Sequence, residues 1–196
     1  IMRIGYVGFA PIAINGDSPV ADKRVRQAIN HAVNRPAIVD AFAGGASKVL
    51  NTPCNPAQFG CVQDVASYDY NPETAKALLA EAGFADGFEL EMVFAAMPRP
   101  VAEAVAADLA KVGITLVLNE QQYSAGIGQW RAKELPAFFS NWGSYGIGDV
   151  VFILSNFFGG GADDLVQDSE VAAWLETADT STDRAIRKEN YAKAVK

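Results

Sequence analysis

Apolar and polar residues follow two patterns along the chain, one typical of strands and one of helices. Residues 2–9 and 88–94 place apolar side chains at alternate positions over much of their length, which predicts half-buried strands. A helix is predicted to begin near Asp22, because apolar residues then recur at the spacing of one buried helical face. These apolar residues are Val25, Ala28, Ile29, Ala32 and Val33.

Proline and glycine residues mark where the next predicted helices begin and end. Pro36 stands in the first turn of a second predicted helix, and Gly44-Gly45 ends this helix. Residues 46–70 are predicted to form a loop. Asn71 and Pro72 then open a further helix as N-cap and first residue, and Gly83 ends it.

The middle of the chain predicts a strand, helix and strand unit. Strand 88–94 is followed by an alanine-rich helical pattern over 98–111, and Gly113 precedes a second strand at 114–118. Two strands joined by a helix in this way run parallel. A further helix at about 124–133, a strand at 136–142 and helices at about 169–178 and 182–196 complete a single α/β domain.

Composition narrows the class of partner. The 196 residues are half apolar and carry 16 basic and 23 acidic side chains, a formal net charge of −7. No basic stripe is available to neutralise phosphates, so nucleic acid and anionic membrane are not expected partners. The longest apolar run, residues 92–97, is far shorter than the roughly 18 residues that suggest a membrane span.

Cys54 and Cys61 lie close together in a turn-rich segment with prolines and glycine. Two thiols and the single histidine, His31, are too few for a usual structural zinc site, so we expect no metal. A disulfide or two free thiols remain. The disulfide is favoured, since it would remove about 2.5 kcal/mol of unfolded-chain entropy, and it would indicate an oxidising compartment.

Catalytic motifs are mostly missing from the sequence. His31 lies in a helical pattern, where a surface or packed role is expected rather than a place in a catalytic triad. Ser144 lacks the glycine arrangement of a nucleophile elbow, and both Gly-Ile-Gly segments lack the third glycine of a phosphate loop. The acidic run of Asp163, Asp164 and Asp168 lacks EF-hand spacing and is expected to form a solvated loop.

One segment does suggest binding. The turn at residues 142–149, Trp-Gly-Ser-Tyr-Gly-Ile-Gly-Asp, follows the carboxyl end of a predicted strand, where open α/β sheets place ligands. Trp and Tyr offer flat apolar surface with one polar group each, and the glycines let a ligand approach the backbone. The alternative is that Trp142 belongs to the core and the glycines only permit a tight turn.

Several stretches in this order resemble one lobe of a known receptor family. They are residues 22–39, 70–84, 87–90 and 108–114, and Trp142-Gly143 falls where that family has a ligand-lining Trp-Gly segment. The resemblance is to the C-terminal lobe of the large periplasmic solute-binding proteins of ABC importers, in the peptide, nickel and opine family. It covers residues 15–196.

The resemblance implies a fold, a partner and a set of site residues. The fold is α/β, one lobe of a type II periplasmic-binding-protein-like fold, with a mixed or parallel sheet flanked by helices. Residues 1–196 would be a single C-terminal lobe, cut from a longer two-lobed receptor and lacking its N-terminal lobe and signal peptide. The ligand-contacting residues would be Phe139, Asn141, Trp142, Gly143, Ser144, Tyr145 and Asp149.

Function follows from the same resemblance. The receptor would be a periplasmic monomer without cofactor or catalytic activity, binding a peptide, or a peptide-like or opine-like solute, between its lobes. It would then deliver that solute to an ABC permease in the inner membrane. An alternative is a fragment of an α/β hydrolase or transferase whose catalytic residues lie elsewhere, and a third is a chaperone-like or peptide-sensing lobe without transport.

Two positions depart from the family's peptide-binding pattern. An aspartate three residues after the Trp commonly pairs with the peptide amine in that family, and here the position is Tyr145. Some oligopeptide binders have an arginine three residues before the Trp, and here it is Phe139. A pocket without these charges favours solutes that lack an isolated ammonium group, although Asp149 offers another acid nearby.

Overall fold

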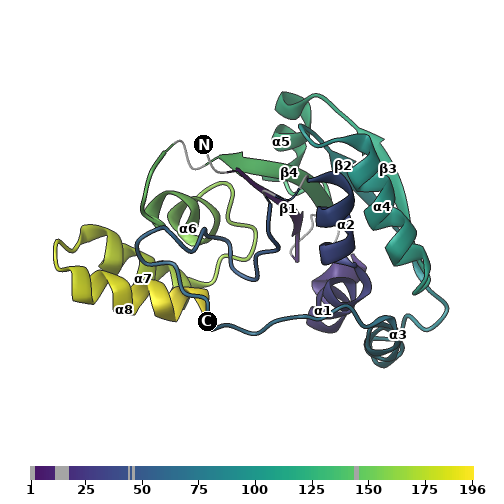
Figure 1. Cartoon of the computed structure of the whole chain (residues 1–196), viewed down its shortest axis with the longest axis horizontal. Coiled ribbons are helices and arrows are strands. Elements are labelled where there is room, and N and C mark those ends of the chain that lie inside the picture. Colours follow the sequence, from purple (N-terminus) through teal and green to yellow (C-terminus); the bar gives the residue numbers. More distant parts are fainter. Residues whose placement is uncertain (1–2, 12–17, 44, 46, 144–145) are drawn as a thin grey trace. The chain divides into compact units, whose positions relative to one another are not determined.

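A computed structural model describes residues 3–11, 18–43, 45, 47–143 and 146–196. Four strands form one sheet in the order β1-β4-β2-β3 (Figure 1). The strands are β1 (Arg3–Phe9), β2 (Phe88–Phe94), β3 (Ile114–Glu120) and β4 (Ala137–Gly143).

The sheet is mixed. β2 runs parallel to β3, with Phe88 opposite Ile114, and parallel to β4, with Met92 opposite Ala137. Ala10, just after β1, donates its N–H to the carbonyl of Pro136, just before β4, so these neighbouring strands run in opposite directions. The structure thus confirms both the parallel strand, helix and strand unit and the α/β class.

Helices make up most of the remaining described chain. Those of the first two thirds are α1 (Lys23–Ala32), α2 (Arg35–Phe42), α3 (Pro72–Glu81), α4 (Arg99–Ala110) and α5 (Tyr123–Arg131), preceded by a short 3-10 turn, η1 (Pro19–Ala21). The last third contains α6 (Val151–Phe158), α7 (Ser169–Thr180) and α8 (Arg184–Val195).

The chain divides into two compact units. The first, which we call the sheet unit, contains residues 5–49 and 68–140. The second, which we call the helical unit, contains residues 1–4, 50–67 and 141–196. β4 ends in the helical unit, so the segment that follows it, with the candidate ligand turn, belongs there.

The sheet unit has helices against both faces of its sheet. On one face, Phe94 and Phe139 are buried in a cluster with residues of α1, α3 and α4. Phe138, one position along β4, points to the other face, where the Trp130 ring of α5 stacks on it. Alternation along the strand therefore places one helical layer on each side.

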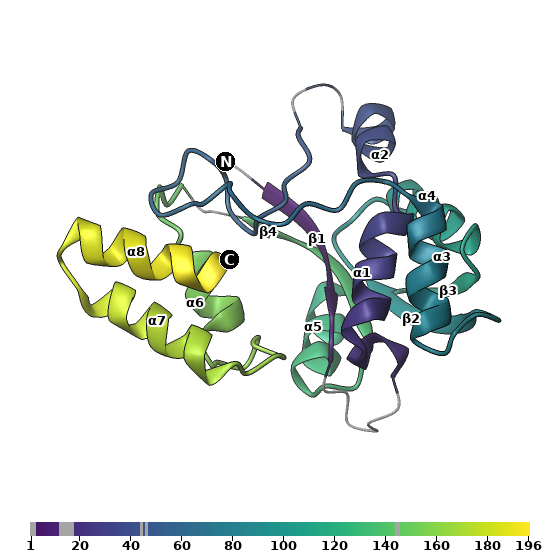
Figure 2. The same ribbon diagram turned by 90° about the horizontal axis from the view of Figure 1, so that it is seen from below.

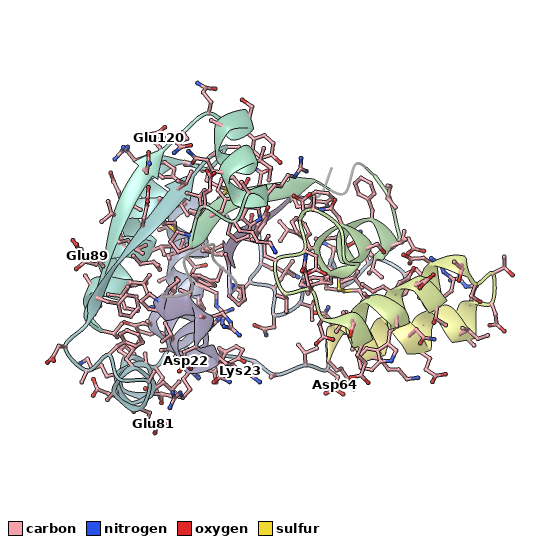
Figure 3. All side chains as sticks on the ribbon, turned by 180° about the vertical axis from the view of Figure 1, so that it is seen from behind. Asp22, Lys23, Asp64, Glu81, Glu89 and Glu120 are labelled. Carbon is pink, nitrogen blue, oxygen red and sulfur yellow. A yellow bond between two sulfur atoms is a disulfide. The ribbon has the colours of Figure 1, made fainter. Side chains whose placement is uncertain are left out.

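Local capping explains where several helices begin. Asp22 accepts a hydrogen bond from the N–H of Arg24 at the start of α1, and Asn71 does the same for Thr74 at the start of α3. The Arg24 guanidinium also binds the Asp22 carboxylate and donates to the carbonyl of Glu81, the last residue of α3. Figure 3 labels Asp22 and Glu81. One arginine therefore joins the start of α1 to the end of α3.

The helical unit packs its three helices around a separate apolar cluster. Leu154 of α6, Leu175 of α7 and Tyr191 of α8 are each almost fully buried in it. α7 and α8 lie side by side (Figure 2). The buried Cys54 belongs to the same cluster, which brings the loop before α3 into contact with the C-terminal helices.

Two expectations need correction. The sequence pattern assigns no element to residues 151–158, where the structure has α6. Asp163 and Asp164 were expected in a solvated loop, yet they are only 8% and 1% exposed. Asp163 accepts a hydrogen bond from Nδ2 of Asn156. Asp164 accepts the backbone N–H groups of Gly160, Val166 and Gln167 and so organises its own loop.

Candidate functional site

Trp142 stands near the end of β4, as the sequence predicts, and is half-buried. Its ring packs against Phe152 and Phe157 of α6, with ring centroids 5.3 and 5.0 Å away. Phe152 is 41% exposed. The two rings of α6 support the Trp142 indole, while the partial exposure of Trp142 and Phe152 provides apolar aromatic surface.

The other predicted ligand residues divide into three groups. Asn141 and Gly143 flank Trp142 and are half-buried. Phe139 is 5% exposed and packs in the core of the sheet unit, which suits support of the strand better than contact with a solute. Ser144 and Tyr145 lie outside the described residues.

Asp149 is already held by two partners. One carboxylate oxygen accepts the backbone N–H of Val151 at the start of α6, and the other accepts Nη2 of Arg187 at 2.9 Å. Both side chains of this ion pair are about one fifth exposed. A solute amine at Asp149 would therefore compete with Arg187, and the carboxylate already has a structural role in placing α6.

The Asp149 ion pair continues into a hydrogen-bond network. Arg187 also donates to the hydroxyl of Tyr191, and this contact, with Asp149 adding to it, raises the pKa of the guanidinium. The Tyr191 hydroxyl donates to Asp179 at 2.8 Å. Burial, reinforced by Asp179 and opposed by Arg187, raises the pKa of Tyr191 to about 12, so the phenol stays protonated at neutral pH.

Cys54 and Cys61 form a disulfide in the structure, with their Cα atoms 5.7 Å apart. The loop that it closes lies against the end of the candidate turn, because Phe59 pairs with Asp149 in an isolated parallel bridge. The sequence shows the cysteine spacing but gives no sign of this contact.

The remaining candidate groups have structural contacts. Within the described ranges, no group of three or more His, Cys, Asp or Glu residues is arranged to hold a metal ion. Asp168 caps α7 by accepting the N–H groups of Glu170 and Val171. Nδ1 of His31 lies 2.8 Å from the carbonyl oxygen of Asp69, which ties α1 to the segment before α3.

Comparison with known proteins identifies the family. The model of the middle part of the bacterial extracellular solute-binding proteins, family 5, matches residues 3–164. The chain therefore belongs to this family of solute-binding proteins. No helix among the described residues is long and apolar enough to cross a membrane.

Two curated relatives show the range of the family. Heme-binding protein A of Haemophilus influenzae is 38% identical over 133 residues, which is 64% of this chain and 24% of that protein. The dipeptide-binding protein of Escherichia coli is 37% identical over 120 residues, 58% of this chain and 22% of that protein. The matched parts span about a quarter of these relatives.

Solved structures share the fold over nearly the whole chain. HbpA2 from Haemophilus parasuis superposes with a TM-score of 0.87 at 29% identity, covering 98% of this chain and 39% of that protein. AgaA from A. tumefaciens R10, solved in complex with agropinic acid, gives a TM-score of 0.80 at 26% identity, with 98% and 40% covered. The fold class predicted from the sequence is confirmed.

Sequence reasoning missed the aromatic residues of α6. Phe152 and Phe157 support Trp142, but they follow the candidate turn in a stretch to which no element was assigned. The available signal was the apolar run at residues 150–154, followed by two further phenylalanines. A helix packing its apolar side under the preceding strand end would account for that run.

Proposed function

We propose that this chain is part of a two-lobed periplasmic receptor, a monomer that binds a peptide-like or opine-like solute and delivers it to an ABC permease in the inner membrane. The chain supplies one lobe, and the solute is bound between the two lobes without chemical change. Membership of the solute-binding family supports the binding role. The names of the relatives, which include a dipeptide-binding protein, support the class of solute.

Trp142 is the observation that carries this proposal. It lies near the end of β4, where the resemblance to the family places a ligand-lining Trp-Gly segment, and Phe152 and Phe157 of α6 pack against its ring. A fixed, half-exposed indole loses little conformational freedom when a solute packs on it, so much of the contact energy appears as affinity.

The charges near the turn support a solute without an isolated ammonium group. Tyr145 stands where peptide-binding members commonly have an aspartate, and the carboxylate of Asp149 is paired with Arg187. An unpaired charge buried in an interlobe pocket is costly. A modified peptide, an opine-like conjugate or a sugar therefore fits better than a conventional free peptide.

The central test is Trp142→Ala in the full-length receptor. Binding is measured by calorimetry with three probes, the dipeptide Met-Leu, agropinic acid and haem, and with any solute that mass spectrometry finds in the purified protein. We expect the substitution to weaken binding by more than about 1 kcal/mol, roughly fivefold or more, because the aromatic contact surface is lost. The fold should be retained.

Phe42→Ala is the matched control, because Phe42 is 48% exposed on α2, outside the helical unit. Unchanged affinity in Trp142→Ala would remove Trp142 from the site. Recovery of the bound solute unaltered supports a receptor, whereas release of a chemically altered product would favour the enzyme alternative.

As a second test of the solute class, Tyr145→Asp should shift preference toward solutes with cationic ends.

A further inference from the structure

The loop closed by the Cys54–Cys61 disulfide is internally ordered. The Gln58 side chain is 8% exposed, and its Oε1 accepts the backbone N–H of Asn55 at 2.9 Å. The N–H of Cys61 donates to the Gln58 carbonyl. The disulfide and these two hydrogen bonds hold Gln58 and Phe59 at the tip of a small closed loop.

Gln58 and Phe59 make four hydrogen bonds with the end of the candidate solute turn. Nε2 of Gln58 donates to the carbonyls of Ile147 at 3.1 Å and Asp149 at 3.2 Å. The N–H of Phe59 donates to the carbonyl of Gly148 at 2.8 Å, and the Phe59 carbonyl accepts the N–H of Val150 at 3.1 Å.

The Phe59 side chain is held from α8. Guanidinium carbons of Arg184 and Arg187 lie 4.2 and 5.1 Å from its ring centroid. Arg187 is also the partner of Asp149, so one side chain contacts both the loop and the turn. Gly60 completes the packing, because a Cβ atom there would lie 2.6 Å from the Tyr191 ring.

We propose that Gln58 and Phe59 are positioning residues for the solute turn, and that the Cys54–Cys61 disulfide locks them in place. This inference rests on the proposed function. Trp142 and the packing of α6 fix the start of the turn, while the disulfide loop fixes its end. When both ends of the turn are held in advance, less conformational entropy is lost as the solute binds, which strengthens binding without any direct contact between loop and solute.

The first test is Gln58→Glu in the full-length receptor, followed by amide hydrogen exchange. Glutamate keeps an oxygen to accept the N–H of Asn55 but loses the amide group that donates to Ile147 and Asp149. We expect amides of residues 146–151 to exchange at least tenfold faster. The double variant Cys54→Ser/Cys61→Ser should give the same pattern.

Asn71→Ala is the control for a merely structural effect. It removes the cap of α3 in the sheet unit and lowers thermal stability without touching the turn. Exchange of residues 146–151 should then stay at the wild-type rate. Unchanged exchange of this segment in Gln58→Glu would overturn the proposal.

The second test measures affinity with Met-Leu, agropinic acid and haem. Gln58→Glu should lower the affinity for any probe that binds the wild type by at least fivefold, and Asn71→Ala should leave that affinity unchanged. A saturating concentration of the probe should restore slow exchange in Gln58→Glu. Faster exchange with unaltered affinity would overturn the positioning role. If the wild type binds none of the probes, the proposed function fails for those solutes, while the exchange rates still decide whether the loop holds the turn.

Discussion

At the scale of single residues, Tyr191 shows how one buried hydroxyl can join several helices. Its ring is fully buried, while its oxygen donates to Asp179 of α7 and accepts from Arg187 of α8. Asp179 also accepts a short hydrogen bond from Ser155 of α6. The three helices of the helical unit are therefore connected through polar groups as well as through their apolar cluster.

This burial predicts a loss of stability at alkaline pH. The pKa of Tyr191 is raised to about 12 in the folded protein from 10.0, so between these values the folded state holds a proton that the unfolded state has released. Its stabilising contribution is complete below pH 10 and is lost as pH rises through 12, amounting to about 2 kcal/mol. Urea denaturation from pH 8 to 12 measures this.

Tyr191→Phe is the comparison for this pH dependence. The variant should be about 1 to 2 kcal/mol less stable at pH 8, because the hydroxyl hydrogen bonds are lost. It should also lack the additional decline between pH 10 and 12. Parallel alkaline profiles for the two proteins would contradict the assignment.

At the same scale, Asp164 shows what local sequence cannot reveal. Its three hydrogen-bond donors are backbone N–H groups of its own loop, and they converge on the carboxylate only once that loop has folded. An acidic, glycine-rich stretch is otherwise typical of solvent-exposed loops. The composition of the loop therefore predicted a solvent-exposed Asp164, whereas the folded loop buries it.

At the scale of elements, most helices and strands were predictable because their signals are local. The start of α3 was marked by Asn71 and Pro72, and its cap forms as expected. The signal for α6 was weaker: Val150, its N-cap, makes no side-chain capping bond, and the N–H of Val151 donates instead to Asp149, one residue before the N-cap. A short apolar run does not by itself distinguish a buried helix from a strand.

The glycines of α5 offer a test of helix-on-sheet packing. A Cβ atom at Gly126 would lie 2.8 Å from the Phe138 ring and 3.2 Å from Val93, whereas at Gly128 it would meet no atom within 4 Å. Gly126→Val should therefore destabilise the protein by about 2 to 3 kcal/mol through overpacking. Gly128→Ala should stabilise it by about 0.5 to 1 kcal/mol, because alanine favours the helix.

Chemical denaturation of the two variants measures these opposite effects. The signs matter more than the sizes, since both substitutions enlarge a glycine in the same helix. A stable Gly126→Val variant would mean that α5 moves away from β4 at little cost, and would contradict a tight packing of the helix on the strand.

At the scale of the whole molecule, the sequence located the candidate site but not its supports. The position of Trp142 at a strand end follows from local pattern. The contact of Arg187 with Asp149 joins residues 38 positions apart, and that of Gln58 with Ile147 joins residues 89 apart. A single sequence does not specify such pairings, because they depend on how the elements pack.

Removing the disulfide should affect one unit more than the other. The chain-entropy argument gives about 2.5 kcal/mol for a loop of this length. Cys54→Ser/Cys61→Ser should therefore lower the stability of the helical unit by about 2 to 3 kcal/mol, because the cystine belongs to its apolar cluster. Hydrogen exchange during urea denaturation, followed separately in α7–α8 and in β2–β3, measures the difference. Equal losses in both units would contradict it.

The four hydrogen bonds that Gln58 and Phe59 make with the turn all reach main-chain atoms of residues 147–150. Those four hydrogen bonds depend on the course of the backbone and are indifferent to side-chain identity there. Mutations that replace side chains at 147 or 148 can thus accumulate without releasing the anchor. Side chains along this stretch can therefore vary while the hydrogen-bonded course of the backbone is kept.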